Sequence, residues 1–102
     1  MKPYIHEATP ETPGVILDQE KDHFELSGRS FPEQARTFYD PIMEWLREYI
    51  RQPNEKTRFH IRMYYYNTAS SKMILEVLKV LQELHKNGGH VEIHWHYQED
   101  DE

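Results

Sequence analysis

Hydrophobic and polar positions alternate along this chain with two different periods, and the change of period marks its elements. Over residues 57–66 apolar and polar side chains alternate one by one, which is the period of a half-buried strand. Beyond Lys72, apolar residues recur every three to four positions as far as about Lys86, which is the period of an amphipathic helix. This helix presents an apolar stripe made of Met73, Ile74, Val77, Leu78, Leu81 and Leu84.

A second alternating segment over residues 90–97 predicts the last strand, and Gly88 and Gly89 before it predict the end of the helix. Alternation assigns each of the two long strands one apolar and one mixed face. In the first strand, Phe59, Ile61, Met63 and Tyr65 are expected on one face and Arg58, His60, Arg62, Tyr64 and Tyr66 on the other. In the last strand, Val91, Ile93, Trp95 and Tyr97 are expected opposite His90, Glu92, His94 and His96.

The first half of the chain contains shorter apolar segments. Residues 15–18 and 23–27 predict two strands, and the polar residues 19–22 between them have the length of a hairpin connection. Residues 4–7 predict a short edge strand, and residues 28–32 predict a turn.

Residues 33–51 carry a helical apolar stripe that is interrupted by Pro41. Proline breaks a helix interior but is tolerated in a first turn, and Asp40 before it is a good N-cap. The sequence therefore predicts a kink or a restart at Asp40 and Pro41, and an end of the helix at Pro53 and Asn54.

The order of these elements predicts an α/β fold with a mixed sheet of four to five strands. The strand, helix and strand of residues 57–97 suit a right-handed parallel crossover. Both helices are amphipathic, so the simplest packing places the two main helices mostly on one face of the sheet. We expect one domain over residues 1–98, followed by an acidic tail over residues 99–102.

The composition and charge of the chain exclude several classes of function. The chain of 102 residues has a net charge of −6, of which the tail supplies four charges, so the body is near neutral. It lacks the basic stripe that nucleic acids or an anionic membrane surface require, and no apolar run approaches the length of a membrane span. There is no cysteine, which excludes thiol chemistry, and no leader sequence, which indicates the cytoplasm.

The junction between the long strand and the helix concentrates hydroxyl groups. Residues 67–72 contain Asn67, Thr68, Ser70, Ser71 and Lys72. Unpaired N–H groups and partial positive charge at a helix N-terminus favour a phosphate there, so a hydroxyl at this point could be a modification switch. The alternative is structural, because Asn, Ser and Thr are the usual N-cap residues.

Two further sets of residues share a strand face and could carry a binding function. His94 and His96 share a strand face and could bind one metal ion, joined by His60 and Glu92, although alternation alone also places polar residues there. Arg58, Arg62, Tyr64 and Tyr66 could bind an anion or a partner, or could form a solvated face with cross-strand pairs. We assign no metal ligands. No spaced carboxylate pair, nucleophile elbow or glycine-rich phosphate loop is present, so neither enzymatic activity nor a cofactor is expected.

Several runs together resemble the SiaC family of bacterial regulatory phosphoproteins. The resemblance covers most of the chain, from about Ile5 to the acidic tail, and its most specific parts lie around Pro32 and around Thr68. The matching runs are TPETP at 9–13, SGRSFPE at 27–33, FYDPI at 38–42, WL at 45–46, YNTASSK at 66–72 and WHY at 95–97. One position departs from the family pattern, because Ala69 stands where serine is common.

The resemblance implies a STAS-like domain that acts in bacterial partner switching. The phosphoacceptor of the family falls on Thr68, with a protein kinase adding the phosphate and a PP2C-type phosphatase removing it. The unphosphorylated form would bind and activate an effector, expected to be a diguanylate cyclase, which raises cyclic di-GMP and favours biofilm. Partner contacts are expected at Asn67, Thr68, Ser70, Ser71 and Lys72. A structural or dimerising module that uses the aromatic and basic sheet face remains the alternative, and a homodimer stays open.

Overall fold

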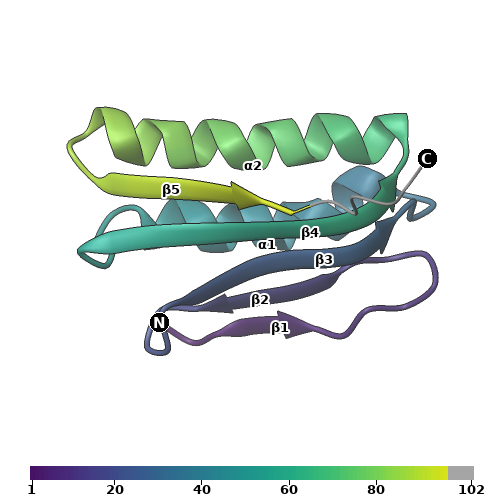
Figure 1. The fold of residues 1–102 in the computed structure, drawn as a ribbon, viewed down its shortest axis with the longest axis horizontal. Helices are drawn as coiled ribbons and strands as arrows, with labels where there is room; N and C mark the ends of the chain where they lie inside the picture. Colours follow the sequence, from purple (N-terminus) through teal and green to yellow (C-terminus); the bar gives the residue numbers. More distant parts are fainter. Residues whose placement is uncertain (97–102) are drawn as a thin grey trace.

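The strongest alternating segment of the sequence forms the longest strand, β4, in the computed structural model of the protein, which describes residues 1–96 (Figure 1). The predicted edge strand near the N-terminus is also present. In chain order the elements are β1 (Tyr4–His6), β2 (Gly14–Asp18), β3 (His23–Ser30), α1 (Ala35–Tyr49), β4 (Lys56–Tyr66), α2 (Thr68–Lys86) and β5 (His90–Trp95).

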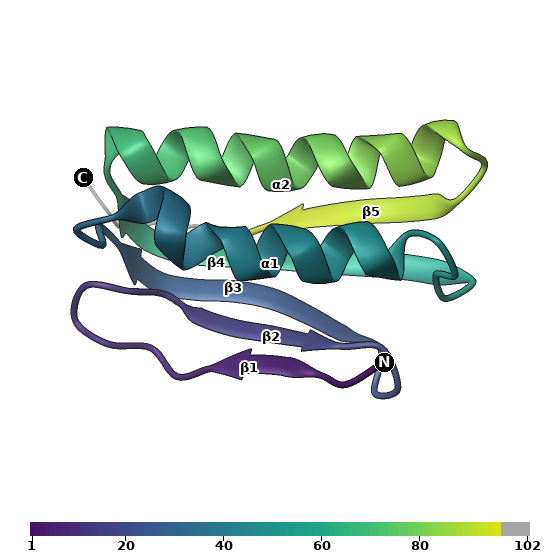
Figure 2. The ribbon, with the colours of Figure 1, turned by 180° about the vertical axis from the view of Figure 1, so that it is seen from behind.

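The five strands form one mixed sheet in the order β1-β2-β3-β4-β5. The first three are joined by short connections and pair antiparallel, whereas β3 with β4 and β4 with β5 pair parallel. Each parallel pair is bridged by a helix, as a parallel connection requires. Two successive crossovers in the same direction place both helices on one face, where they pack against each other (Figure 2). The predicted α/β architecture is confirmed.

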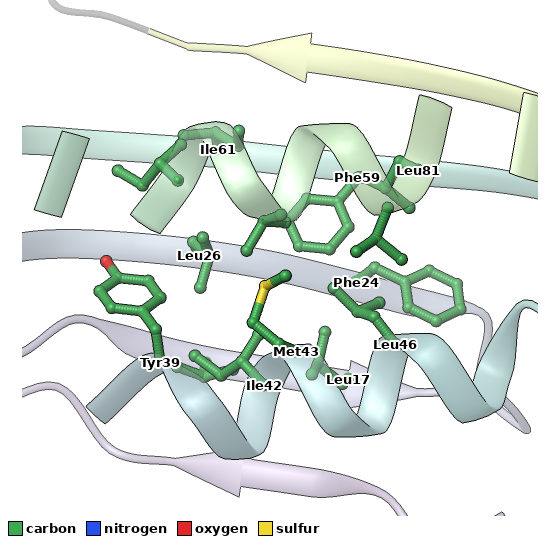
Figure 3. Close-up of a cluster of buried hydrophobic side chains, with 14 of the residues drawn as sticks. Leu17, Phe24, Leu26, Tyr39, Ile42, Met43, Leu46, Phe59, Ile61 and Leu81 are labelled. Atoms are coloured by element: carbon green, nitrogen blue, oxygen red, sulfur yellow. The ribbon is translucent and has the colours of Figure 1, made fainter. Parts of the chain in front are cut away.

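The core lies between the helices and the inner face of the sheet (Figure 3). Leu26 of β3 and Ile61 of β4 are fully buried there, opposite Ile42 of α1 and Leu81 of α2. Complete burial of such a side chain stabilises a fold by roughly 1.5–3 kcal/mol. The inward positions of β4 are those that alternation predicts, with Phe59, Ile61 and Met63 all buried.

The end of β3 differs from the prediction. Strand pairing continues through Gly28 to Ser30, so the turn predicted over residues 28–32 is wrong. Gly28 has φ of +94°, which glycine adopts without strain, and the register shifts between Gly28 and Arg29. Because this shift skips Tyr64, Tyr65 pairs with Arg29 and is 53% exposed, so its predicted place on one strand face with Phe59 is wrong.

The helix α1 crosses Pro41 without a restart. It runs from Ala35 to Tyr49 as one element, and its N-cap is Gln34, so the predicted restart with Asp40 as cap is wrong. Pro41 removes the hydrogen bond to the carbonyl of Thr37 four residues earlier. Both Pro41 and Thr37 are on the exposed side of the helix, where water can satisfy that carbonyl.

The helix α2 ends as the sequence predicts. Gly88 has φ of +98°, its N–H donates to the carbonyl of His85 at 3.0 Å, and the N–H of Gly89 donates to Leu84 at 3.0 Å. These two bonds form a Schellman motif. β5 then ends at Trp95, while Tyr97 and the predicted tail 99–102 lie outside the described residues. No helix within residues 1–96 is long and apolar enough to span a membrane.

Candidate functional site

The junction that the sequence singles out is a tight joint between β4 and α2. Only Asn67 separates the two elements. Asn67 has extended backbone angles, φ −85° and ψ 180°, and its Oδ1 accepts a hydrogen bond from the N–H of Ser70 at 2.9 Å. The N–H of Asn67 in turn donates to the carbonyl of Ser30 at 3.1 Å, at the end of β3. Asn67 is therefore the N-cap of α2, and it ties the helix to two strands.

Thr68 is the first residue of α2, and its side chain is exposed. Its predicted alternative role as the helix cap is wrong, because a cap needs non-helical backbone angles and Asn67 holds that position. No hydrogen bond joins the Thr68 hydroxyl to any other part of residues 1–96. The hydroxyl is thus exposed at the positive end of a 19-residue helix, and Asn67, not Thr68, caps that helix.

Ser70, one of the predicted partner contacts, lies inside the protein. It is 0% exposed, and its hydroxyl accepts a hydrogen bond from Ser30 Oγ at 2.7 Å. Ser30 Oγ also lies 2.7 Å from the hydroxyl of Tyr39 on α1. Since Ser30 gives its proton to Ser70, Tyr39 must donate to Ser30. Ser70 cannot touch a partner or a kinase in this structure; it fixes the first turn of α2 to β3 and α1.

The buried surroundings of Tyr39 change the pKa of its phenol. Burial raises the pKa of the Tyr39 phenol above its usual value, and the hydrogen bonds with Ser30 and Ser70 oppose that rise. Tyr39 therefore stays protonated and remains a donor across the physiological range. The three-residue chain keeps the start of α2 in place beneath Thr68.

A shallow hollow with basic residues on its rim adjoins Thr68. Thr68 and Lys72 are four residues apart, so they occupy the same face of α2. Arg36, near the start of α1, lines the same hollow, which has a volume of about 620 Å³. Ser71 is exposed beside it. Of the predicted partner contacts, Asn67, Thr68, Ser71 and Lys72 thus lie together at an accessible or half-accessible surface, whereas Ser70 does not.

A second hollow lies on the other side of Asn67, where β3 and β4 end side by side (Figure 1). Tyr64 and Tyr65 are 66% and 53% exposed there, and the ring of Tyr65 meets that of Phe31 edge-on at 5.6 Å. Arg29 also lines this hollow. The sequence pattern assigns Tyr64 only to a possible partner face and does not assign Arg29, Phe31 or Tyr65 to a site, because it ends β3 at Ser27. The run SGRSFPE, placed beside the carboxyl end of β4, was the available signal.

The outer sheet face pairs its own charges. Arg58 lies 3.4 Å from Glu92, and Arg62 lies 3.5 Å from Glu25, across neighbouring strands. The interpretation of this face as solvated cross-strand pairs matches these contacts. Glu92 also accepts hydrogen bonds from His94 and His90, which with Arg58 lower its carboxyl pKa to about 2.

Three imidazoles lie together on that face, because β4 and β5 are neighbouring strands. His60 pairs with His94 in register, and His60 Nδ1 lies 3.2 Å from His96 Nε2. Burial, together with the neighbouring histidines and Arg62, lowers the pKa of His60 and favours its neutral form. Among residues 1–96, however, no three His, Cys, Asp or Glu side chains are arranged to hold a metal ion.

The chain is similar in sequence and in structure to proteins of Pseudomonas aeruginosa. A curated relative, an uncharacterized protein of Pseudomonas aeruginosa strain UCBPP-PA14, is 27% identical over 89 residues, which is 87% of this chain and 71% of the relative. The solved structure of SiaC of Pseudomonas aeruginosa has a TM-score of 0.92 and 25% identity, and the match covers 99% of this chain and 84% of that one.

A further solved structure, of the diguanylate cyclase SiaD in complex with its activator SiaC from Pseudomonas aeruginosa, matches with a TM-score of 0.90 and 25% identity. That match covers 97% of this chain and 81% of the solved chain. The sequence profile of the SiaC family regulatory phosphoproteins matches residues 6–102, almost the whole chain. The protein therefore belongs to the SiaC family of regulatory phosphoproteins.

Proposed function

We propose that this protein is a non-enzymatic phospho-switch that binds and activates a diguanylate cyclase, and that phosphorylation of Thr68 releases the cyclase. A protein kinase would add the phosphate, and a PP2C-type phosphatase would remove it. Two comparisons support the proposal: the family consists of regulatory phosphoproteins, and a similar protein, SiaC, is the activator of a cyclase with which it forms a complex.

The observation that carries the choice of residue is the free hydroxyl of Thr68. It is exposed at the first position of α2, while Asn67 does the capping and Ser70 is buried. A kinase can reach Thr68 without breaking a hydrogen bond within the described residues. Ser71 is the other exposed hydroxyl of this turn, and it serves as the alternative acceptor in the test below.

Charge explains how one modification could end an interaction. Phosphorylation adds about −1.5 to −2 charges at this point. The N-terminus of α2, Lys72 and Arg36 would attract that phosphate and thereby be withdrawn from a partner. An interface that buries the neutral hydroxyl would also have to desolvate the new charge, which costs more than burying a hydroxyl. We infer that Asn67, Ser71, Lys72 and the adjacent hollow with Tyr64 and Tyr65 form the effector contact.

The test measures cyclase binding and cyclic di-GMP synthesis with wild type, Thr68→Ala, Thr68→Glu and Ser71→Ala. Wild type, Thr68→Ala and Ser71→Ala should bind and activate, and Thr68→Glu should lose at least tenfold in affinity. Gln52→Glu is the matched control, because it adds one negative charge at an exposed position after α1. If Thr68→Glu activates as well as Gln52→Glu does, Thr68 is not the switch.

The kinase reaction is tested separately by mass spectrometry of the modified chain. Treatment of wild type with the kinase should give one phosphate on the peptide that contains Thr68, and Thr68→Ala should remain unmodified. A phosphate that persists in Thr68→Ala and disappears in Ser71→Ala would transfer the acceptor role to Ser71.

A further inference from the structure

The two edges of the sheet are built very differently. β1 has only three residues, Tyr4–His6, and follows Pro3. A short edge strand and a neighbouring proline both disfavour pairing with a further strand. β5 has six residues, His90–Trp95, contains no proline, and alternates apolar with polar side chains. Within residues 1–96 no strand pairs with its outer side. We propose that the free edge of β5 pairs antiparallel with β5 of a second copy of this chain and forms a two-fold dimer.

The direction of the backbone groups on β5 limits the possible register. The N–H of His96 donates to the carbonyl of Ile61 on β4 at 2.8 Å. Alternate residues of a strand point to the same neighbour, so Glu92 and His94 also direct their backbone groups at β4. Val91, Ile93 and Trp95 therefore direct their N–H and C=O groups to the free edge. A partner strand must pair through these three residues.

The two-fold register centred on Ile93 uses all three of them. Ile93 then faces Ile93 of the second copy, and Val91 faces Trp95, each as a hydrogen-bonded pair. The positions between them place Glu92 of one copy opposite His94 of the other, twice in the dimer. These non-hydrogen-bonded pairs bring side chains closest together, so acid faces imidazole on both sides of the axis. Shifting the centre to Glu92 would oppose two carboxylates, and shifting it to His94 would oppose two imidazoles.

The helical side of the same edge has an apolar surface that such a dimer would cover. Ile93 and Trp95 are 40% and 41% exposed, and Leu75 of α2 is 52% exposed. Between α2 and β5 runs a groove lined mainly by apolar side chains, including Leu75, Leu78, Val91 and Ile93. A two-fold axis through Ile93 brings the two grooves together, so the hydrogen-bonded edge and the apolar contact are continuous. Interfaces between identical copies are commonly of this self-complementary kind.

The surface does not include the phosphoacceptor, although Leu75 lines both the groove and the hollow beside Thr68. Thr68 does not line the groove between α2 and β5, and the capping hydrogen bond of Asn67 is not part of it. The inference therefore goes beyond the proposed function, and the two can fail independently. Thr68→Glu should leave the dimer unchanged.

The first experiment is sedimentation velocity of the full chain over a concentration series up to about 1 mM. The wild type should shift with concentration from its mass of 12.4 kDa to twice that mass. Ile93→Lys should remain a monomer throughout. Ile5→Lys is the matched control, since it makes the same substitution on the other edge strand at a residue that is 57% exposed, and it should dimerise as wild type does. A wild type that stays monomeric, or an Ile93→Lys protein that still dimerises, would overturn the proposal.

The register is tested by cross-linking, which the absence of native cysteine makes clean. Glu92→Cys and His94→Cys proteins are prepared separately, mixed, and oxidised mildly. The mixture should give a disulfide-linked dimer, because opposed residues of a non-hydrogen-bonded pair approach within reach of a disulfide. Each protein alone should cross-link at least tenfold more slowly. Equal cross-linking in the mixture and in the separate proteins would exclude the register centred on Ile93.

Discussion

The two helices begin at the same end of the molecule, yet their first turns are fixed in different ways (Figure 2). Gln34, the residue before α1, makes no side-chain capping bond. Asn67, the residue before α2, caps its helix through Oδ1 and binds β3 through its N–H. The start of α1 thus depends on packing of the helix as a whole, whereas the start of α2 is fixed by local hydrogen bonds. The candidate phosphoacceptor lies at the fixed start.

The two starts are also physically connected. Tyr39, in the second turn of α1, is fully buried and extends its hydroxyl to Ser30, which binds Ser70 in the first turn of α2. Helix α1 therefore supports the surface around Thr68 from beneath, and its Arg36 lines the hollow beside Thr68. A rigid support is useful for a switch, because a single added charge then acts on a preformed surface.

Among variants that test how the two helix starts are fixed, Ser30→Ala should have the largest effect on the free energy of unfolding. Ser30 lies between Tyr39 and Ser70, so its loss leaves two buried hydroxyls with fewer hydrogen-bond partners. A buried polar group without a partner costs about 1–3 kcal/mol, and the free energy of unfolding should fall by that amount. Urea denaturation measures it. Ser27→Ala on the same strand is the control and should change stability by less than about 0.5 kcal/mol. Equal effects of the two variants would show that the chain of hydroxyls does not support the fold.

Removal of the caps tests the comparison directly. Asn67→Ala should lower the free energy of unfolding by about 1 kcal/mol, because the N–H of Ser70 loses its acceptor. Gln34→Ala should change it by no more than about 0.5 kcal/mol, since the Gln34 side chain does not cap α1. Thermal and urea unfolding of the two variants, measured together, would contradict the comparison if Gln34→Ala were the more damaging.

The uncapped start can also be repaired. Gln34→Asp places a carboxylate where it can accept from the first N–H groups of α1 and interact with the helix dipole. Stability should rise by about 0.5 kcal/mol, measured by the urea midpoint. The control is Gln82→Asp, at an exposed position inside α2, which should lower stability because Asp is a poor helix former. A loss of stability in Gln34→Asp would mean that the start of α1 is already satisfied by packing.

The smallest effect is expected in alkaline solution. The pKa of Tyr39 is higher in the folded protein than in the unfolded chain, so above about pH 10 the unfolded chain releases its proton first. Stability should therefore fall as pH rises through that range. Tyr49, whose pKa burial also raises, adds to the fall. Tyr39→Phe should flatten the pH dependence of the unfolding free energy, and an unchanged slope in this variant would exclude Tyr39 as a cause.

The elements with a strong local pattern follow from the amino-acid sequence alone. Alternation predicts β4 and its buried Phe59 and Ile61, and the helical stripe with Gly88 and Gly89 predicts the extent of α2. The resemblance in the run YNTASSK predicts the family, which the comparison confirms. These features succeed because side-chain period, cap chemistry and positive φ at glycine act over a few residues.

Long-range contacts in the folded protein, in contrast, determine which hydroxyl of the run YNTASSK is free. Asn67, Thr68, Ser70 and Ser71 are all acceptable at a helix start, and the sequence ranks them no further. The continuation of β3 to Ser30 brings an acceptor and a donor from 40 residues away in the chain, and these bury Ser70 and orient Asn67. The register shift in the same long-range pairing also exposes Tyr65. Pairing across the sheet is set by distant residues, and for that physical reason no local pattern reveals it.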